Sequence, residues 1–199
     1  MMAHMIILPI LLPLFAGLLI LFEWRQRVWL RRLISVTATA ALLPLAGFLW
    51  LQAAGGEIGV YRLGDWAPPF GIVLVLDQLA ALMLLVTALL ALPVCLQACR
   101  GEDNNGANFQ ALFQFQLLGI NGAFLTGDLF NLFVFFEVLL IASYALLMHG
   151  QGPERARAGL HYVVLNLTGS SLFLFGLGLI YAATGTLNMA DVTRVMMEG

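Results

Sequence analysis

Six long runs of apolar residues dominate the sequence, and each is close to the length of a membrane-spanning helix. They cover about residues 5–22, 33–52, 72–97, 109–126, 129–148 and 160–183. A bilayer core of about 30 Å needs roughly 20 apolar residues in a helix. The runs are continuously apolar, which favours helices over the alternating pattern of barrel strands. The sequence therefore predicts an all-α membrane protein, a polytopic bundle of about six helices.

The composition agrees with this prediction. Only 10% of the residues are charged, whereas a soluble domain carries about 25%. Four prolines, Pro9, Pro13, Pro44 and Pro93, lie inside the runs. Membrane helices tolerate them where neighbouring groups satisfy the freed carbonyls. The net charge of -2 is too small to indicate an electrostatic partner such as nucleic acid.

The arginines predict the orientation, because the positively charged loops of membrane proteins face the cytoplasm. The chain has no lysine. Seven arginines fall in the loops after the first, third and fifth runs, and two fall on the other side. The first set is Arg25, Arg27, Arg31, Arg32, Arg100, Arg155 and Arg157, and the second is Arg62 and Arg194. Both chain ends are therefore expected outside.

We divide the chain into two parts. Residues 1–108 form a three-helix segment, and residues 109–199 contain the next three spans with a tail. The tail at 186–199 is expected to be a short interfacial helix that begins at Asn188, with apolar residues along one face. The Gly- and Pro-rich outer loop at 53–71 predicts a structured turn.

One carboxylate, Glu137, lies deep inside the fifth run. It stands eight residues beyond Leu129, which places it roughly 12 Å below the outer edge of the membrane. An ionised carboxylate at that depth costs several kcal/mol unless it is paired, and otherwise it stays protonated. No basic residue of this chain lies at a matching depth. Either state suits a proton carrier, so Glu137 is the leading functional residue.

Two rows of polar residues follow neighbouring runs at helical spacing. Gln110, Gln114 and Asn121 fall on one face of the fourth, and Tyr162, Asn166 and Ser170 recur every four residues in the sixth. Tyr144 shares a face with Glu137, two turns nearer the cytoplasm. These side chains are either interhelical hydrogen-bond glue or a hydrated proton path, and the sequence leaves both open.

Three further titratable residues suggest local roles. Asp77 is expected about two turns into the third span, as a structural anchor. Asp128 begins the fifth span, where a carboxylate favourably meets a helix N-terminus. His161 is expected at the cytoplasmic start of the sixth span. There it is an ordinary interfacial side chain or a proton relay near neutral pH.

Soluble-type enzyme motifs are missing from the sequence. It contains no phosphate-binding glycine loop, nucleophile elbow or dinucleotide fingerprint. Cys95 and Cys99 supply two potential ligands with no histidine near them in sequence, which predicts apolar packing and not a metal site. We therefore expect no enzyme activity, no cofactor and no bound metal.

Several segments resemble a known family. The stretch 113–140, which contains Thr-Gly-Asp-Leu-Phe-Asn-Leu-Phe-Val-Phe-Phe-Glu, closely resembles the D-type subunit of the bacterial Mrp/Pha multisubunit cation/proton antiporters. Residues 67–77, 158–167 and 183–191 are also similar. These subunits belong to a larger group related to the membrane arm of respiratory complex I.

The resemblance implies a fold of about fourteen helices with two inverted five-helix repeats. It also implies that Glu137 works with a lysine on the seventh helix of the family. This sequence departs from the family because it stops after the sixth span and has no lysine. We therefore expect an N-terminal portion of such a subunit, which cannot complete proton transfer alone.

Three functional hypotheses follow. The first is a proton-conducting subunit of a multisubunit Na⁺/H⁺ antiporter in the bacterial inner membrane, with the other subunits, protons, a monovalent cation and lipid as partners. The second is the equivalent subunit of a membrane-bound hydrogenase or a complex I-like enzyme. The third is a non-catalytic assembly scaffold.

Overall fold

The computed structural model describes residues 2–23, 27–66, 71–105, 108–150 and 152–198. These residues form six long helices, a two-stranded hairpin and a short final helix. The helices are α1 (Leu8–Phe22), α2 (Val28–Ala53), α3 (Gln78–Ala98), α4 (Phe109–Leu125), α5 (Leu129–Leu147), α6 (Pro153–Thr184) and α7 (Met189–Glu198). The strands are β1 (Gly59–Arg62) and β2 (Val73–Leu76), and short 3-10 turns cover Met2–Met5, Leu63–Asp65 and Glu102–Asn105.

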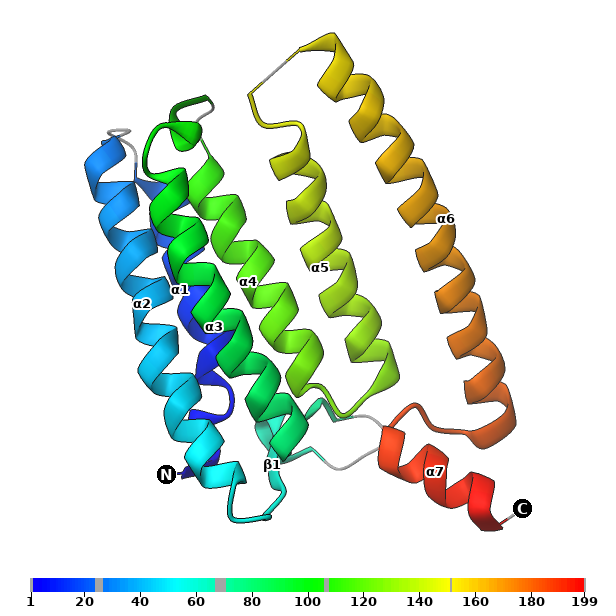
Figure 1. Cartoon of the computed structure of the whole chain (residues 1–199). Helices are drawn as coiled ribbons and strands as arrows, with labels where there is room; N and C mark the ends of the chain where they lie inside the picture. Colours follow the sequence, from blue (N-terminus) through cyan, green and yellow to red (C-terminus); the bar gives the residue numbers. More distant parts are fainter. Residues whose placement is uncertain (1, 24–26, 67–70, 106–107, 151, 199) are drawn as a thin grey trace.

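The six long helices lie side by side in an up-and-down arrangement (Figure 1). Helices α1 to α4 form a bundle, α5 packs on α4, and α6 lies outermost against α5. We call the end with β1, β2 and α7 the hairpin end, and the opposite end, where α2 and α6 begin, the arginine-rich end. Both ends of the chain lie at the hairpin end (Figure 1), as expected for an even number of crossings.

The predicted multi-pass membrane architecture is confirmed. Four helices, α2, α3, α5 and α6, are long and apolar enough to cross a bilayer. The other two are shorter, with 15 residues in α1 and 17 in α4. Helix α1 is apolar. Both short helices run alongside the longer ones in the bundle.

Three expected boundaries were wrong. The third helix begins at Gln78 and not at residue 72, because residues 73–76 form strand β2. Helix α2 already begins at Val28, so two of the loop arginines, Arg31 and Arg32, lie in its first turns. Helix α6 begins at Pro153, where proline suits the first helical turn, and not near residue 160.

The outer loop contains a β-hairpin that the pattern of apolar runs does not reveal. Strands β1 and β2 pair antiparallel, with Gly59 opposite Leu76. By hydropathy, the Val-Leu-Val-Leu segment of β2 is indistinguishable from a membrane span. Its backbone nevertheless pairs with β1 on one edge and with the linker after α4 on the other. There the amide of Gly127 donates to the carbonyl of Val73 at 2.9 Å. Residues 67–70 of the predicted turn lie outside the described residues.

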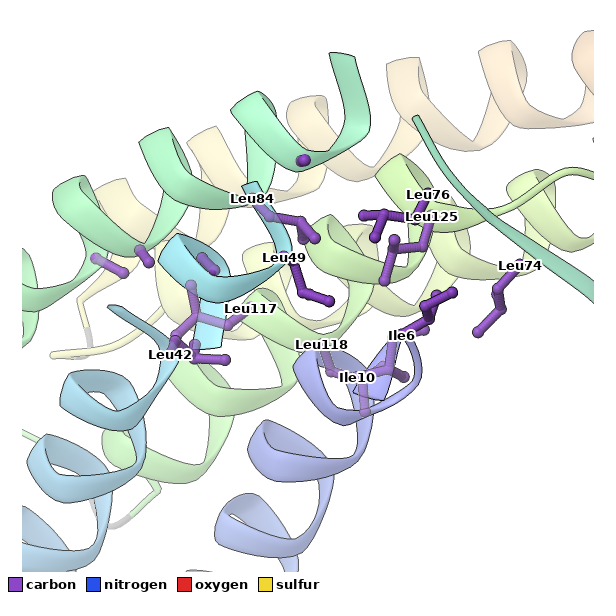
Figure 2. Packing of buried hydrophobic residues seen from close by; sticks show 14 of the residues in the cluster. Ile6, Ile10, Leu42, Leu49, Leu74, Leu76, Leu84, Leu117, Leu118 and Leu125 are labelled. Carbon is purple, nitrogen blue, oxygen red and sulfur yellow. The ribbon is translucent and has the colours of Figure 1, made fainter. Parts of the chain in front are cut away.

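The core lies within the α1–α4 bundle (Figure 2). Leucines from several elements meet there, among them Leu49 of α2 and Leu125 of α4, which are both fully buried. Two glycines of α4 then let α5 approach closely. A Cβ atom at Gly119 would lie 2.8 Å from the backbone nitrogen of Leu139, and one at Gly122 would lie 2.2 Å from the ring of Phe135. Small residues at such crossings are typical of membrane helix packing.

Candidate functional site

Glu137 lies in the middle of α5. The helix begins after Asp128, whose carboxylate accepts a hydrogen bond from the backbone nitrogen of Asn131 at 2.9 Å. Eight residues separate Glu137 from Leu129, a rise of roughly 12 Å. The Oε1 atom of Glu137 is buried and has no hydrogen-bond partner among the described residues. A buried acceptor without a donor is costly, so it is a point that requires an explanation.

Two aromatic contacts set how α5 and α6 align. The rings of Phe133 and Phe173 stack at 6.3 Å, and those of Tyr144 and Tyr162 meet edge-on at 5.5 Å. In two antiparallel helices, residues at the same level have numbers with a constant sum. That sum is 306 for both pairs, so one register describes the whole contact. Glu137 therefore lies at the level of Gly169.

A cleft of about 230 Å³ opens between the two helices at this level. Glu137 is not itself among the residues that line the cleft, but it falls within 60° of Phe133 and Leu140 around α5, which places it beside the lining face. A Cβ atom at Gly169 would have nothing within 4 Å. The cleft is lined by Phe133, Phe136, Leu140, Leu165, Asn166, Gly169, Ser170 and Phe173.

The polar row of α6 faces this cleft. Asn166 and Ser170 line it, and each also bonds to its own helix. The Asn166 amide donates to the carbonyl of Tyr162 at 2.8 Å, and the Ser170 hydroxyl donates to that of Leu167 at 3.3 Å. The structure thus brings Asn166, Ser170 and the Tyr144–Tyr162 pair to the α5 face that carries Glu137. Gly169 was not predicted as part of the site. Its position between Asn166 and Ser170 could have indicated it, because a glycine leaves room beside the polar side chains.

His161 lies eight residues inside α6 and not at its start. Its side chain is exposed, and Nδ1 is 2.9 Å from the carbonyl oxygen of Arg157. It borders a groove of about 560 Å³ with Pro153, Glu154, Arg157 and Ala158. The next residue, Tyr162, contacts Tyr144, so the groove adjoins the α5–α6 seam.

The polar row of α4 points elsewhere. Gln114 is fully buried, and its Nε2 donates to the carbonyl and hydroxyl of Ser35 and to the hydroxyl of Thr39 at 3.0–3.1 Å. Gln110 donates to Asp103 at 3.1 Å. These contacts join α4 to α2 and to the loop after α3, on the side of the bundle away from α6.

Asn121 satisfies a carbonyl that a proline leaves free. Pro13 has no N–H, so the carbonyl of Pro9 has no helical donor. The Asn121 amide donates to that oxygen at 2.9 Å across the α1–α4 interface. Asn121, the third member of the α4 row, therefore also makes an interhelical contact. A neighbouring helix here supplies the hydrogen bond that a proline removes from its own helix.

The two structural aspartates both lie at helix starts. Asp77 precedes α3 and accepts from the backbone nitrogen of Ala80 at 2.7 Å. It therefore lies at the beginning of the span and not two turns inside, because β2 occupies the preceding residues. Asn188 caps α7 by accepting from Ala190 and Asp191 at 3.2 and 3.3 Å. These caps fix the hairpin end.

A buried ion pair closes the arginine-rich end of the α2–α4 bundle. Arg32 donates two 2.7 Å hydrogen bonds to Asp103, which is 8% exposed. Burial raises the pKa of Asp103, but hydrogen bonds from Arg32 and Gln110 lower it by more, so the pKa lies below its ordinary value. Within the described ranges, no group of three or more His, Cys, Asp or Glu side chains is arranged to hold a metal ion.

Comparison with known proteins gives concordant similarities. The family profile described as "NADH:quinone oxidoreductase/Mrp antiporter, TM" matches residues 126–199. A probable K⁺/H⁺ antiporter subunit of the D type from Rhizobium meliloti is 53% identical over 95% of the chain and 36% of that protein. The corresponding D-type Na⁺/H⁺ antiporter subunit of Bacillus subtilis is 44% identical over 99% of the chain and 40% of that protein.

The fold is similar as well. A chain of the Mrp complex from Dietzia sp. superposes with a TM-score of 0.85 at 31% identity, over 97% of this chain and 39% of that one. The chain thus spans less than half the length of the relatives it matches. Sequence and structure agree along nearly all of its residues, and over them the chain is similar to the D-type subunits of cation/proton antiporters.

Proposed function

We propose that Glu137 is the proton-binding carboxylate of a monovalent cation/proton antiporter, and that this chain supplies part of its proton path. The observation that carries the proposal is the buried, unpartnered Oε1 of Glu137 beside the α5 face that lines an open cleft. A carboxyl group in such a place exchanges a proton when a donor or water enters. The reaction is transfer of a proton, without covalent chemistry on a substrate.

The seam between α5 and α6 provides a route to Glu137 from the arginine-rich end. It leads from the groove beside His161 past Tyr162 and Tyr144 to the cleft at Asn166 and Ser170. Imidazole, phenol and water can pass protons along such a row. Gln114 and Asn121 lie off this route, because their amides are engaged within the α1–α4 bundle. We assign them to packing.

The names of the relatives support a monovalent cation as the exchanged ion. The Rhizobium meliloti protein is described as a probable K⁺/H⁺ antiporter subunit and the Bacillus subtilis protein as a Na⁺/H⁺ antiporter subunit. The relative of known structure is part of the Mrp complex. We infer that this chain acts with other membrane subunits and exchanges Na⁺ or K⁺ for protons.

The deciding experiment is Glu137→Gln, which keeps the shape of the side chain and removes its proton-binding group. Proton flux driven by Na⁺ or K⁺ is measured in everted vesicles from cells that produce the chain with the rest of its transport complex. We expect flux to be abolished in E137Q and partly retained in E137D. The matched control is Glu57→Gln, which removes an exposed carboxylate at the hairpin end. Full cation-dependent flux in E137Q would disprove the assignment and favour the scaffold hypothesis.

A second function shares the same proton site. The matching family profile also covers NADH:quinone oxidoreductase subunits, so a redox-driven complex is the alternative source of driving force. The same vesicles distinguish the two. An imposed Na⁺ or K⁺ gradient moves protons in the antiporter without an electron donor, whereas the redox complex requires the donor. In both cases E137Q stops proton movement.

A further inference from the structure

Cys95 and Cys99 form a pair of thiols at the arginine-rich end, away from the α5–α6 seam. They lie one turn apart at the end of α3: Cys95 is fully buried inside the helix, and Cys99 is half-buried at the capping position just after the last helical residue, Ala98. Neither is in a disulfide. They are the two cysteines of the sequence, so the pair can be studied without other thiols.

One side-chain amide binds both sulfur atoms. The Nε2 of Gln110 donates to Cys99 Sγ at 3.4 Å, and Cys95 Sγ donates to Gln110 Oε1 at 3.8 Å. The Ser35 hydroxyl lies 3.5 Å from Cys95 Sγ. The two thiols therefore converge on one point at the α4 surface, in a polar setting. Cys95 also belongs to the hydrophobic core cluster, so these polar contacts add to the expected apolar packing.

Charged groups adjoin the pair. Gln110 also donates to Asp103, which holds Arg32 through two hydrogen bonds. A negative charge on Cys99 would meet the amide N–H of Gln110. One on Cys95 would meet the Ser35 hydroxyl, while the Gln110 carbonyl oxygen would have to turn away. The nearest charged groups, Asp103 and Arg32, neutralise each other. Outer hydrogen-bond donors stabilise thiolates bound to a metal.

Geometry favours a bridging ion over a disulfide. Residues four apart on a helix have Cβ atoms about 5–6 Å apart, whereas a disulfide needs roughly 3.5–4.5 Å. With the zinc–thiolate distance of about 2.3 Å as a guide, an ion bound linearly between two sulfurs spans about 4.6 Å from sulfur to sulfur. The helix can supply that span without unwinding its last turn.

We propose that Cys95 and Cys99 bind one thiophilic monovalent metal ion, Cu(I), through both sulfurs. Soft thiolates select Cu(I), and two ligands suffice for it, whereas structural zinc takes four. No third ligand of the His, Cys, Asp or Glu type joins them in the described parts of the chain. Each thiol loses its proton, so two thiols and one Cu⁺ give one two-coordinate complex of charge −1 and two protons released to solvent.

The test is a Cu(I) titration of the purified reduced chain in detergent against bicinchoninate, which reports free Cu(I). We expect one Cu(I) bound per chain and two protons released per ion. Loss of an outer-shell partner costs roughly 10–100-fold in metal affinity, so loss of a ligand in C95S or C99S should weaken binding by more than about 100-fold. Unchanged affinity in the C95S/C99S double variant, or no binding by the reduced wild-type chain, would overturn the proposal.

A second measurement needs no variant and so holds even if a serine substitution impairs folding. X-ray absorption at the copper edge of the wild-type complex should show two sulfur neighbours at a single distance. A shell dominated by nitrogen or oxygen would contradict the site. Rapid formation of an intramolecular Cys95–Cys99 disulfide under mild peroxide, with α3 intact, would contradict the geometric argument.

Discussion

The seam between α2 and α4 and the seam between α5 and α6 contain similar polar residues in opposite surroundings. At the first, Gln114 is fully buried and its amide nitrogen has three acceptors on Ser35 and Thr39. At the second, Asn166 and Ser170 line an open cleft and bond only to carbonyls of their own helix in the contacts that the described residues make. The first seam is filled, and the second leaves room for water or a further group.

The surroundings of a polar side chain, filled or open, distinguish a packing role from a functional role better than its residue type does. A buried amide whose two N–H groups are shared among three oxygens has little capacity to pass protons, because reorientation would break these hydrogen bonds together. A side chain that borders a cavity can exchange partners at little cost. Glu137 stands on the open side. The Oε1 atoms of Glu137 and Gln114 both lack a hydrogen-bond partner among the described residues, so the neighbouring cleft, and not the unpartnered oxygen, distinguishes the two positions.

The contact between α4 and α5 joins the two sides, and Gly119→Leu should break it. A Cβ atom there meets Leu139 Cβ at 2.6 Å and backbone atoms at 2.8 and 2.9 Å, which cannot move aside without shifting α5. Overpacking usually costs about 1–3 kcal/mol, and backbone overlap places this change above about 3 kcal/mol. Loss of α5 docking is measured by the free energy of unfolding in mixed micelles and by protease sensitivity of the α4–α5 linker.

The matched control is Gly176→Leu in α6, where nothing lies within 4 Å of the added Cβ. It should change the free energy of unfolding by less than about 0.5 kcal/mol, as at other open surface sites. Equal stability of the two variants would show that the helices are not held by this close approach.

The cleft opposite Glu137 can be filled without disturbing the fold, by Gly169→Leu. The position is open, so stability should match that of G176L. Flux should nevertheless fall by about 10-fold or more, since displacing a reacting group by about 1 Å can cost on the order of 100-fold. The measurement is cation-driven proton flux in everted vesicles. Normal flux in G169L would place the proton path outside the α5–α6 seam.

The position of Glu137 within its helix and the face of each polar row were predictable from sequence. Both follow from the start of an apolar run and from helical periodicity, and α5 begins at Leu129 as predicted. The direction of the α4 row was not predictable. Periodicity groups Gln110, Gln114 and Asn121 on one face, but only the tertiary arrangement decides whether α2 or α6 meets it.

The β-hairpin and the contacts of Gln110 with the two thiols were not predicted, for a related reason. Strand β2 is as apolar as the helix that follows, and its state depends on hydrogen bonds to β1 and to the linker at Gly127, which are distant in sequence. Likewise, Gln110 reaches both cysteines from another helix. Open space at Gly169 depends on the register of α5 against α6, which no local pattern records.

Asp103→Asn removes the ion pair with Arg32 in the α2–α4 bundle. This change should lower the free energy of unfolding and leave proton flux unchanged. We expect a cost of about 1.5–3 kcal/mol, the range for hydrogen bonds to a charged group. Because the pKa of Asp103 lies below the ordinary 3.8 in the folded chain, its contribution is full above that value and is lost as the pH falls through the folded pKa. The difference between wild type and D103N should therefore stay constant from pH 7 to about pH 5 and shrink below.

Asp191→Asn is the control for that ion pair. Asp191 pairs with Arg194 at 3.4 Å, with side chains 33% and 67% exposed, and exposed pairs contribute at most about 1 kcal/mol. A D191N effect as large as that of D103N would mean that burial does not distinguish the two pairs.

The smallest effect tests whether Asn121 serves packing alone. Asn121→Leu leaves the Pro9 carbonyl without a donor, at a cost of about 1 kcal/mol, since interhelical hydrogen bonds in membranes average about 0.6 and unsatisfied groups cost about 1–3. Pro13→Ala restores a backbone N–H four residues from Pro9, so N121L should cost less in the P13A background than in wild type. The double-mutant cycle is measured by unfolding in mixed micelles. If N121L lowered proton flux and P13A failed to restore it, Asn121 would belong to the path, and the division between a filled and an open seam would no longer hold.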